Sequence, residues 1–313
     1  MQRLLPVAFF ALLAAAAPVS EAQTGAKVQR LGILALPEVS ANPQNLETFR
    51  KRLGELGYRD PDNLRIEQRI GERDKLPAMA AQLVALKVDA ILALGTDAAL
   101  AAKQATTSVP IVFVGADDPV AKAGGNLTGL TSAPRDLIAQ LVGRLKEVKP
   151  KMKRVVVLTS VKNPAAASLL QEAKAAGQPL GLKIDVTDVA RAEDAAAVFA
   201  AVGKTKPDGV VITLAPVTPA KAAELALKTR LAAIHERRDF VQAGGLMSYG
   251  AKQADMYHLA AGYVFRVLRG AKPKDLPVAQ PASFELRVNL KTAKTLRLTV
   301  PQSVLTRADE VIR

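Results

Sequence analysis

The sequence predicts an α/β protein with two lobes, each built on a parallel β-sheet covered by helices. Residues 88–94 form an aliphatic run with almost no polar side chain, which is typical of a strand buried on both faces. A glycine, a helix-forming segment at 98–105 and a second buried run at 111–114 complete a strand–helix–strand unit. The alternation begins again at Arg154, after a polar break at 149–151. Two such series predict two Rossmann-like lobes.

The remaining elements of the first series follow from apolar runs and their periodicity. Strands are expected at 28–36 and 64–70, and a glycine turn with a short strand is expected within 124–132. The second of these alternates apolar and polar residues, as a half-exposed edge strand does. Helices are expected at 43–57, 76–86 and 134–148, and the first two have an apolar stripe.

The second series repeats the pattern without a sequence repeat. Strands are expected at 155–159, 183–186, 209–214, 232–234, 244–249 and 284–288. Helices are expected at 163–176, 192–202, 219–229, 238–243, 253–269 and 290–298, with a short capping helix over 301–312. A proline-rich connector of extended character lies at 270–281.

The N-terminus has the features of an export signal. Arg3 precedes an apolar run over 4–17, and small residues at Ser20 and Ala22 fit cleavage before Gln23, so that 1–22 is a signal peptide. The run is short for a membrane span, although a retained N-terminal helix is the alternative. We therefore expect a soluble protein in a bacterial periplasm.

The composition excludes several classes of function. The chain has no Cys, which excludes disulfides, thiolate metal sites and a Cys nucleophile, and its two His argue against a zinc site. The net charge is +14, but Lys and Arg are scattered without interleaved aromatic residues, so a solvated basic surface is favoured over nucleic-acid binding. No phosphate-binding glycine fingerprint or nucleophile elbow is present. We expect no cofactor, no metal and no catalysis.

Candidate site residues lie where strands end, because ligands of open parallel sheets bind beyond the carboxyl ends of the strands. In the first lobe they are Pro37, Gly95, Thr96, Asp97 and Asp117. The helix that begins near Thr96 offers free N–H groups to an anion, whereas Asp97 would repel a carboxylate and attract an ammonium. Helix capping by Thr96 and Asp97 is the alternative. The acids at 117 and 118 could pair with a ligand amine, and the alternatives are a turn or ion pairs with nearby Lys.

The second lobe offers a matching set after its own strands. It comprises Ser160, Lys162, Asn163, Ala215, Pro216, His235 and Tyr249. Lys162 could supply a countercharge for an anionic group, and helix capping, with Asn163 as N-cap, is the alternative for part of the set. His235 and Glu236 are not expected to form an acid–base dyad, because adjacent residues on a strand point to opposite faces.

Several segments together resemble the substrate-binding proteins of ABC transporters, in the family related to bacterial tryptophan and tyrosine binding proteins. The segments are FRKRLGELGY (49–58), 76–120, GGNLTGL (124–130), AGGLMSYG (243–250), 260–301 and RADEVI (307–312). The resemblance implies the type I periplasmic binding protein fold, with two lobes that close around a small ligand over a multi-strand hinge. It also implies a partner, the transporter permease in the inner membrane, and a monomer.

The resemblance places the chain crossings near Ser132, Tyr249 and Ser283. The first lobe would comprise 26–132 with 250–282, and the second 133–249 with 283–313. The chain departs from the family pattern at Asp97, at the short segment 121–123, after Leu214 and at 235–237. These loops are expected to line the cleft, so the ligand is expected only to be small and polar or zwitterionic. The expected function is that of the periplasmic substrate-binding subunit of an ABC importer. An exported ligand sensor is the alternative. An enzyme is not expected, because the sequence offers no catalytic set of residues.

Overall fold

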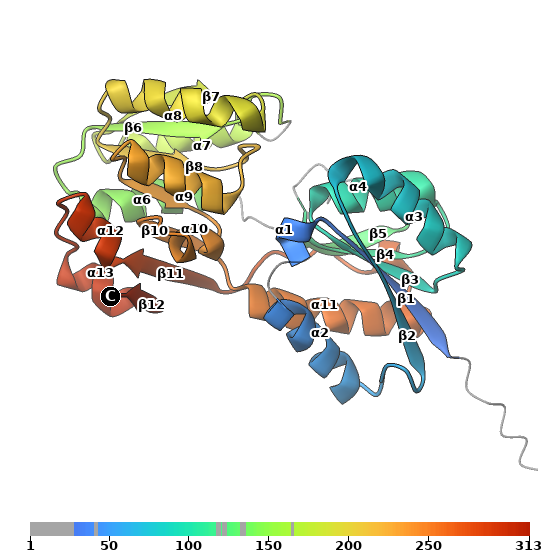
Figure 1. Ribbon diagram of the computed structural model, residues 1–313. Coiled ribbons are helices and arrows are strands. Elements are labelled where there is room, and N and C mark those ends of the chain that lie inside the picture. Colours follow the sequence, from blue (N-terminus) through green and yellow to red (C-terminus); the bar gives the residue numbers. More distant parts are fainter. Residues whose placement is uncertain (1–27, 41–42, 117–119, 121–123, 132–135, 164–165) are drawn as a thin grey trace, which may run out of the picture.

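The structure is a computed structural model that describes residues 28–313 except 41–42, 117–119, 121–123, 132–135 and 164–165. It consists of two α/β lobes, each with its own sheet, and the chain passes between them more than once (Figure 1). In the part of the chain that is described, no helix is both long and apolar enough to cross a bilayer.

The first lobe has a five-stranded parallel sheet in the order β2-β1-β3-β4-β5. Its strands are β1 (Gln29–Ala35), β2 (Leu64–Ile70), β3 (Ala90–Leu94), β4 (Ile111–Ala116) and β5 (Leu127–Thr131). The five residues of β3 are all buried, as their aliphatic run predicts, and β2 is the partly exposed edge strand.

Helices cover both faces of this sheet because successive residues of β1 point in opposite directions. Leu31 and Ile33 pack against α2 (Pro43–Glu55) and α11 (Gln253–Leu268). Leu34, on the other face, packs against α3 (Leu76–Ala85) and α4 (Thr96–Ala105). Helix α11 comes from the late part of the sequence, so the chain returns to the first lobe to complete its core.

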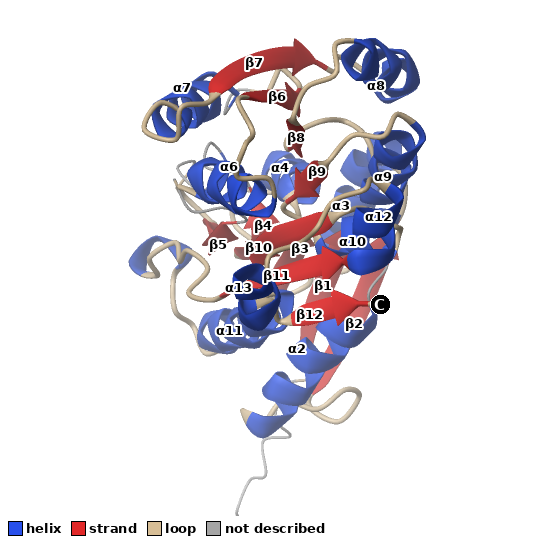
Figure 2. Cartoon of the chain, turned by 90° about the vertical axis from the view of Figure 1, so that its left-hand side faces the viewer, coloured by secondary structure: helices blue, strands red, loops and turns tan. Residues whose placement is uncertain are grey.

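The second lobe has a seven-stranded sheet in the order β12-β11-β10-β9-β8-β6-β7. Its strands are β6 (Arg154–Thr159), β7 (Lys183–Asp188), β8 (Gly209–Ile212), β9 (Ala233–His235), β10 (Met247–Ala251), β11 (Phe284–Asn289) and β12 (Glu310–Ile312). Figure 2 shows helices on both sides of this sheet. One side has α6 (Leu137–Val148) and α7 (Ala166–Gly177), and the other has α8 (Ala195–Lys204), α9 (Pro219–Lys228) and α10 (Arg238–Gln242).

Two expectations for this lobe are wrong. The sheet is not wholly parallel, because β11 runs antiparallel to β10. Strand β10 leaves the sheet towards the first lobe, and β11 enters from that side, so the two must run in opposite directions. The expected helix over 301–312 is also wrong: α13 (Gln302–Arg307) ends early, and 310–312 pair with 287–289 of β11. Helix α13 and α12 (Leu290–Thr295) close the end of the lobe far from the first lobe (Figure 1).

Candidate functional site

The carboxyl ends of the parallel strands face the other lobe in both sheets. Strand β5 ends at Thr131, where the chain leaves for the second lobe, and β10 ends at Ala251, where it returns to the first. Since parallel strands end at the same edge of a sheet, β1, β3 and β4 end beside the first crossing and β6, β8 and β9 beside the second (Figure 1). This arrangement brings the loops that carry the predicted site residues to facing edges of the two lobes.

In the first lobe, Gly95 lies directly before α4. It has φ +87°, a conformation that favours glycine, and its N–H donates to the carbonyl of Val114 at 2.9 Å. The alternative that Thr96 caps the helix is therefore wrong: Gly95 is the N-cap, and Thr96 is the first residue of the helix. Pro37 lies at the start of α1 (Pro37–Ser40), two residues after the end of β1, and is exposed.

Asp97, in the first turn of α4, forms an ion pair with Arg73. Arg73 lies in a 3₁₀ turn before α3, and local sequence patterns do not connect it with Asp97, 24 residues later. The Arg73 guanidinium therefore balances the charge of the Asp97 carboxylate at the N-terminus of α4. Exposed pairs of this kind contribute only about 0.2–1 kcal/mol. Asp117 lies outside the described residues.

In the second lobe, hydrogen bonds join the loops that follow β6 and β8. The N–H of Ser160 donates to the carbonyl of Leu214 at 3.2 Å, and the N–H of Asn163 donates to the carbonyl of Ser160 at 3.0 Å. Helix α7 is described only from Ala166, so a cap at Asn163 followed by Pro164 lies partly outside the described residues. These bonds hold Ser160 and Asn163 in one turn at the strand ends.

The neighbouring candidates Lys162, Ala215 and Pro216 lie at the same edge. Lys162 is exposed, and it lies within electrostatic reach of Asp194: a hydrogen bond from Arg191 and, more weakly, the charge of Lys162 lower the pKa of the Asp194 carboxyl. Ala215 and Pro216 are half-buried. Thr218, two residues further on, caps α9 by accepting a hydrogen bond from the N–H of Lys221 at 3.3 Å.

His235 ends β9 with its ring inside the lobe. The side chain is buried and packs against Phe240, with 5.4 Å between ring centroids. Its Nδ1 accepts a hydrogen bond from the N–H of Arg237 at 3.0 Å. Burial lowers the pKa of His235, so the imidazole is neutral at neutral pH. The ring is placed as a core residue that shapes the following turn.

Glu236 is the unexpected residue of this edge. Its Oε2 lies 3.3 Å from Nδ1 of His235, although strand alternation was expected to separate the two side chains. That expectation is wrong because β9 ends at His235 and the chain turns at Glu236. Because Nδ1 already accepts a hydrogen bond, it offers no proton to the carboxylate. Oε2 is buried and has no hydrogen-bond partner among the described residues.

The turn at Glu236 is packed against the hinge strands. A Cβ added to Gly250 of β10 would lie 1.8 Å from the carbonyl oxygen of Glu236, so only glycine fits there.

Arg237 forms an ion pair with Asp239 at 2.6 Å. Burial raises the pKa of Tyr257, on α11 of the first lobe, to about 12, and the charge of Arg237 opposes that rise. Arg237 of the second lobe therefore lies close to the first.

Tyr249 lies in the hinge strand β10, opposite Leu286 of β11. Its ring stacks on Phe284 with 5.6 Å between centroids. The guanidinium of Arg144, on α6, lies 5.1 Å from the centre of the Tyr249 ring. These contacts place Tyr249 between the hinge and α6.

Among the described residues, no group of three or more His, Asp or Glu side chains is arranged to hold a metal ion.

Two lobes with facing strand ends, joined by hinge strands, define a binding protein of the type I periplasmic class. A sequence model of the ABC transporter substrate-binding protein family matches residues 31–312, and the chain belongs to that family.

Similar proteins have been described with amino-acid ligands. A tyrosine-binding protein of Clostridioides difficile (strain R20291) is 24% identical over 287 residues, which cover 86% of this chain and 81% of the relative. The structure of an ABC domain in complex with L-Trp from Streptococcus pneumonia is 26% identical, with a TM-score of 0.80 over 91% of this chain and 99% of that one. A ligand-free, open substrate-binding protein from Clostridium difficile is 20% identical with a TM-score of 0.70, covers 91% and 99% of the two chains, and shows the shared fold alone.

Proposed function

We propose that this chain is the substrate-binding subunit of an ABC importer and that it captures a small amino-acid-like zwitterion between two closing lobes. The observation that carries the proposal is the pair of facing strand edges, which present charged groups of both signs. Asp97 and Arg73 stand on the first lobe, and Lys162 and Glu236 on the second. Each lobe holds part of the set, so closing the lobes around a ligand completes it.

A zwitterion fits this edge because it supplies what the protein groups lack. The buried Oε2 of Glu236 needs a donor, and the ammonium of an amino acid is a charged donor. The ligand carboxylate would exchange with Asp97 at the start of α4, where N–H groups and Arg73 favour an anion. The tyrosine and L-Trp named for two similar proteins support the amino-acid class.

The cellular setting of the proposal follows from the family. The subunit would lose residues 1–22 on export, act as a monomer in the periplasm and deliver its ligand to a membrane permease. We propose the lobe division 26–132 with 250–282 against 133–249 with 283–313. Binding would occur without turnover, because the family is one of substrate-binding proteins, and the imidazole of His235 is buried and neutral. Family membership favours transport over a sensor role.

The test is calorimetric titration of the chain from Gln23 onward with the common amino acids. The amino acid that binds best is then compared with its analogue that lacks the amino group. We expect Glu236→Gln to weaken binding about 10–100-fold, because a charged hydrogen bond contributes about 1.5–3 kcal/mol. Glu224→Gln, on the exposed face of α9, is the matched control and should bind like the wild type.

Two results would contradict the proposal. The first is that no amino acid binds to the folded protein. The second is that an amino acid binds, but its analogue without the amino group binds equally well and Glu236→Gln has no effect. That outcome would leave a binding protein whose ligand is not held by its amine.

A further inference from the structure

Positive charge gathers at the edge of the second lobe that lies opposite the facing strand ends. Lys151 and Lys153 stand in the loop before β6, and Lys204 and Lys206 stand before β8. All four are exposed, and none has an ion-pair partner among the described residues. Since parallel strands begin at one edge of a sheet, the two loops lie at the same end of the lobe.

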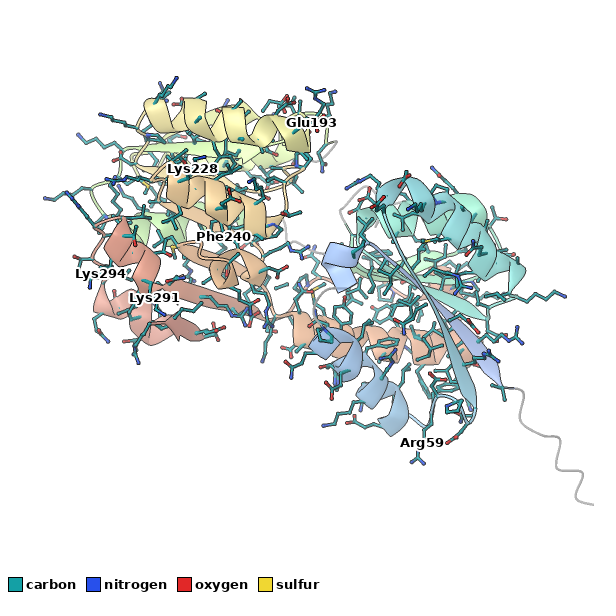
Figure 3. All side chains as sticks on the ribbon, viewed as in Figure 1. Arg59, Glu193, Lys228, Phe240, Lys291 and Lys294 are labelled. Atoms are coloured by element: carbon teal, nitrogen blue, oxygen red, sulfur yellow. The ribbon has the colours of Figure 1, made fainter. Side chains whose placement is uncertain are left out.

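Two further elements add to this end. Lys228 and Arg230 precede β9, and α12 contributes Lys291 and Lys294. Because β11 is antiparallel to β10, the helix that follows it lies at the edge where the parallel strands begin. These four residues are also exposed without an ion-pair partner among the described residues. Figure 3 shows Lys291 and Lys294 on the side away from the first lobe, and Glu193 on the side that faces it. Lys228 is the last residue of α9, before β9 begins. We name these eight cations the basic pole.

Carboxylates at this end already have partners. Asp208 accepts a hydrogen bond from Nζ of Lys149 at 2.7 Å. Asp185 pairs with Arg154 at 2.6 Å and with Lys183 at 3.5 Å. The cations in these pairs are not members of the basic pole, so the charge of the pole is left without local compensation.

We propose that the basic pole binds the anionic phospholipid surface of a bilayer and holds the protein at the membrane. Most members of the pole are Lys, whose ammonium is a hydrated point charge suited to a diffuse layer of phosphate groups. They are spread over several loops and helix ends without aromatic residues beside them in the sequence, so the pole offers no stacking platform for nucleic acid bases. The strands separate the pole from the facing edges, which leaves those edges free while the pole is bound.

The strength of such binding follows from the number of charges near the lipid. Each Lys or Arg close to an anionic surface tightens binding about fivefold, and the effect fades within a Debye length of about 8–10 Å at physiological salt. Three cations therefore account for roughly a hundredfold. The binding should weaken steeply as salt is added.

The experiment is co-sedimentation of the chain from Gln23 onward, which lacks the apolar run over 4–17, with vesicles of phosphatidylcholine that contain one-third phosphatidylglycerol. The test variant is Lys228→Glu/Lys291→Glu/Lys294→Glu. The matched control is Arg50→Glu/Lys51→Glu/Arg59→Glu, which changes net charge equally on exposed residues of the first lobe; Figure 3 shows Arg59 at the far end of that lobe. We expect the wild type to bind these vesicles and not pure phosphatidylcholine, the test variant to lose at least about a hundredfold, and the control less than about fivefold.

Three outcomes would overturn the proposal. The first is an equal loss of binding in both variants, which would assign the binding to net charge. The second is that the wild type does not bind the vesicles at low salt. The third is displacement of the protein by inorganic phosphate at matched ionic strength, which would indicate a discrete phosphate site. If the test variant does not fold, the same three positions are changed to Gln and the control positions likewise. The result does not depend on which small ligand the protein binds.

Discussion

At the scale of single residues, Asp208 shows how a surface turn fixes the start of two strands. Its carboxylate accepts hydrogen bonds from Nζ of Lys149 at 2.7 Å and from the N–H groups of Lys153 at 2.9 Å and Arg154 at 3.1 Å. The Lys149 hydrogen bond, followed by the Lys153 one, lowers the pKa of Asp208 from 3.8 to about 2. The loop before β8 is thereby tied to the first residues of β6.

This pKa shift predicts how stability changes in acid. Because the folded-state pKa lies below the unfolded one, Asp208 stabilises the fold above 3.8, and the stabilisation is lost as the pH falls through that value towards about 2. Allowing for solvent screening, we expect about 1–2 kcal/mol. Asp208→Asn should lose this at neutral pH and show a flatter decline in acid, measured by urea unfolding. If the variant and wild-type curves stay parallel, the carboxylate is not coupled to folding.

At the scale of elements, β12 pairs with β11 through the backbone, and the side chain of Arg287 in β11 adds a contact to it. The Arg287 side chain is 9% exposed and donates to both oxygens of Glu285 at 2.7 Å. It also donates to Glu310 of β12 at 2.6 Å. Asp309 accepts the N–H of Leu286 at 2.7 Å, which fixes the chain just before β12.

Replacing Arg287 should therefore lower the free energy of unfolding far more than replacing its exposed partner Glu310. Arg287→Leu leaves Glu285, 13% exposed, as an unpaired buried charge, and we expect a loss of about 3–5 kcal/mol in the free energy of unfolding. Glu310→Gln affects a side chain that is 44% exposed and should cost less than about 1 kcal/mol. Denaturant titration of both variants measures the difference. Similar losses in the two would show that Arg287 matters only as the anchor of β12.

The same elements show what the sequence can and cannot reveal about the fold. Buried parallel strands such as β3 and β8 are visible because they are short, wholly aliphatic runs. Strand β12 is not visible, because its three residues are extended only through pairing with 287–289, more than twenty residues earlier. The prediction of a helix to Ile312 followed local pattern alone. The antiparallel direction of β11 likewise depends on the chain's route through the other lobe.

The candidate site divides in the same way. Gly95 and Ser160 could be placed at a strand edge, because a buried run followed by a glycine or polar turn marks the strand end. Which of these side chains can reach a ligand depends on contacts with other parts of the fold. His235 is covered by Phe240, Asp97 is paired with Arg73, and Glu236 retains a buried oxygen without a partner among the described residues. The sequence around each of these three residues does not indicate any of these contacts.

At the scale of the whole molecule, the proposed function requires the two lobes to move as units about the hinge strands. Each lobe has its own cores on both faces of its own sheet, so the lobes can move relative to each other without repacking. The crossings beside Thr131, Ala251 and Phe284 carry the connection, and the pairing of Ala251 with Phe284 links two of them. A rotation there would bring the facing strand edges together.

This motion can be measured directly because the chain has no Cys, so introduced thiols are labelled uniquely. Spin labels at Leu100→Cys on α4 and Glu193→Cys before α8 report the distance between the lobes from exposed positions. Labels at Glu193→Cys and Lys228→Cys lie in one lobe and serve as the control. We expect the amino acid that binds in the calorimetric test to shorten the first distance and leave the second unchanged. Saturating ligand with no change in the first distance would mean that binding does not close the lobes, and the facing edges would then not act together as one site.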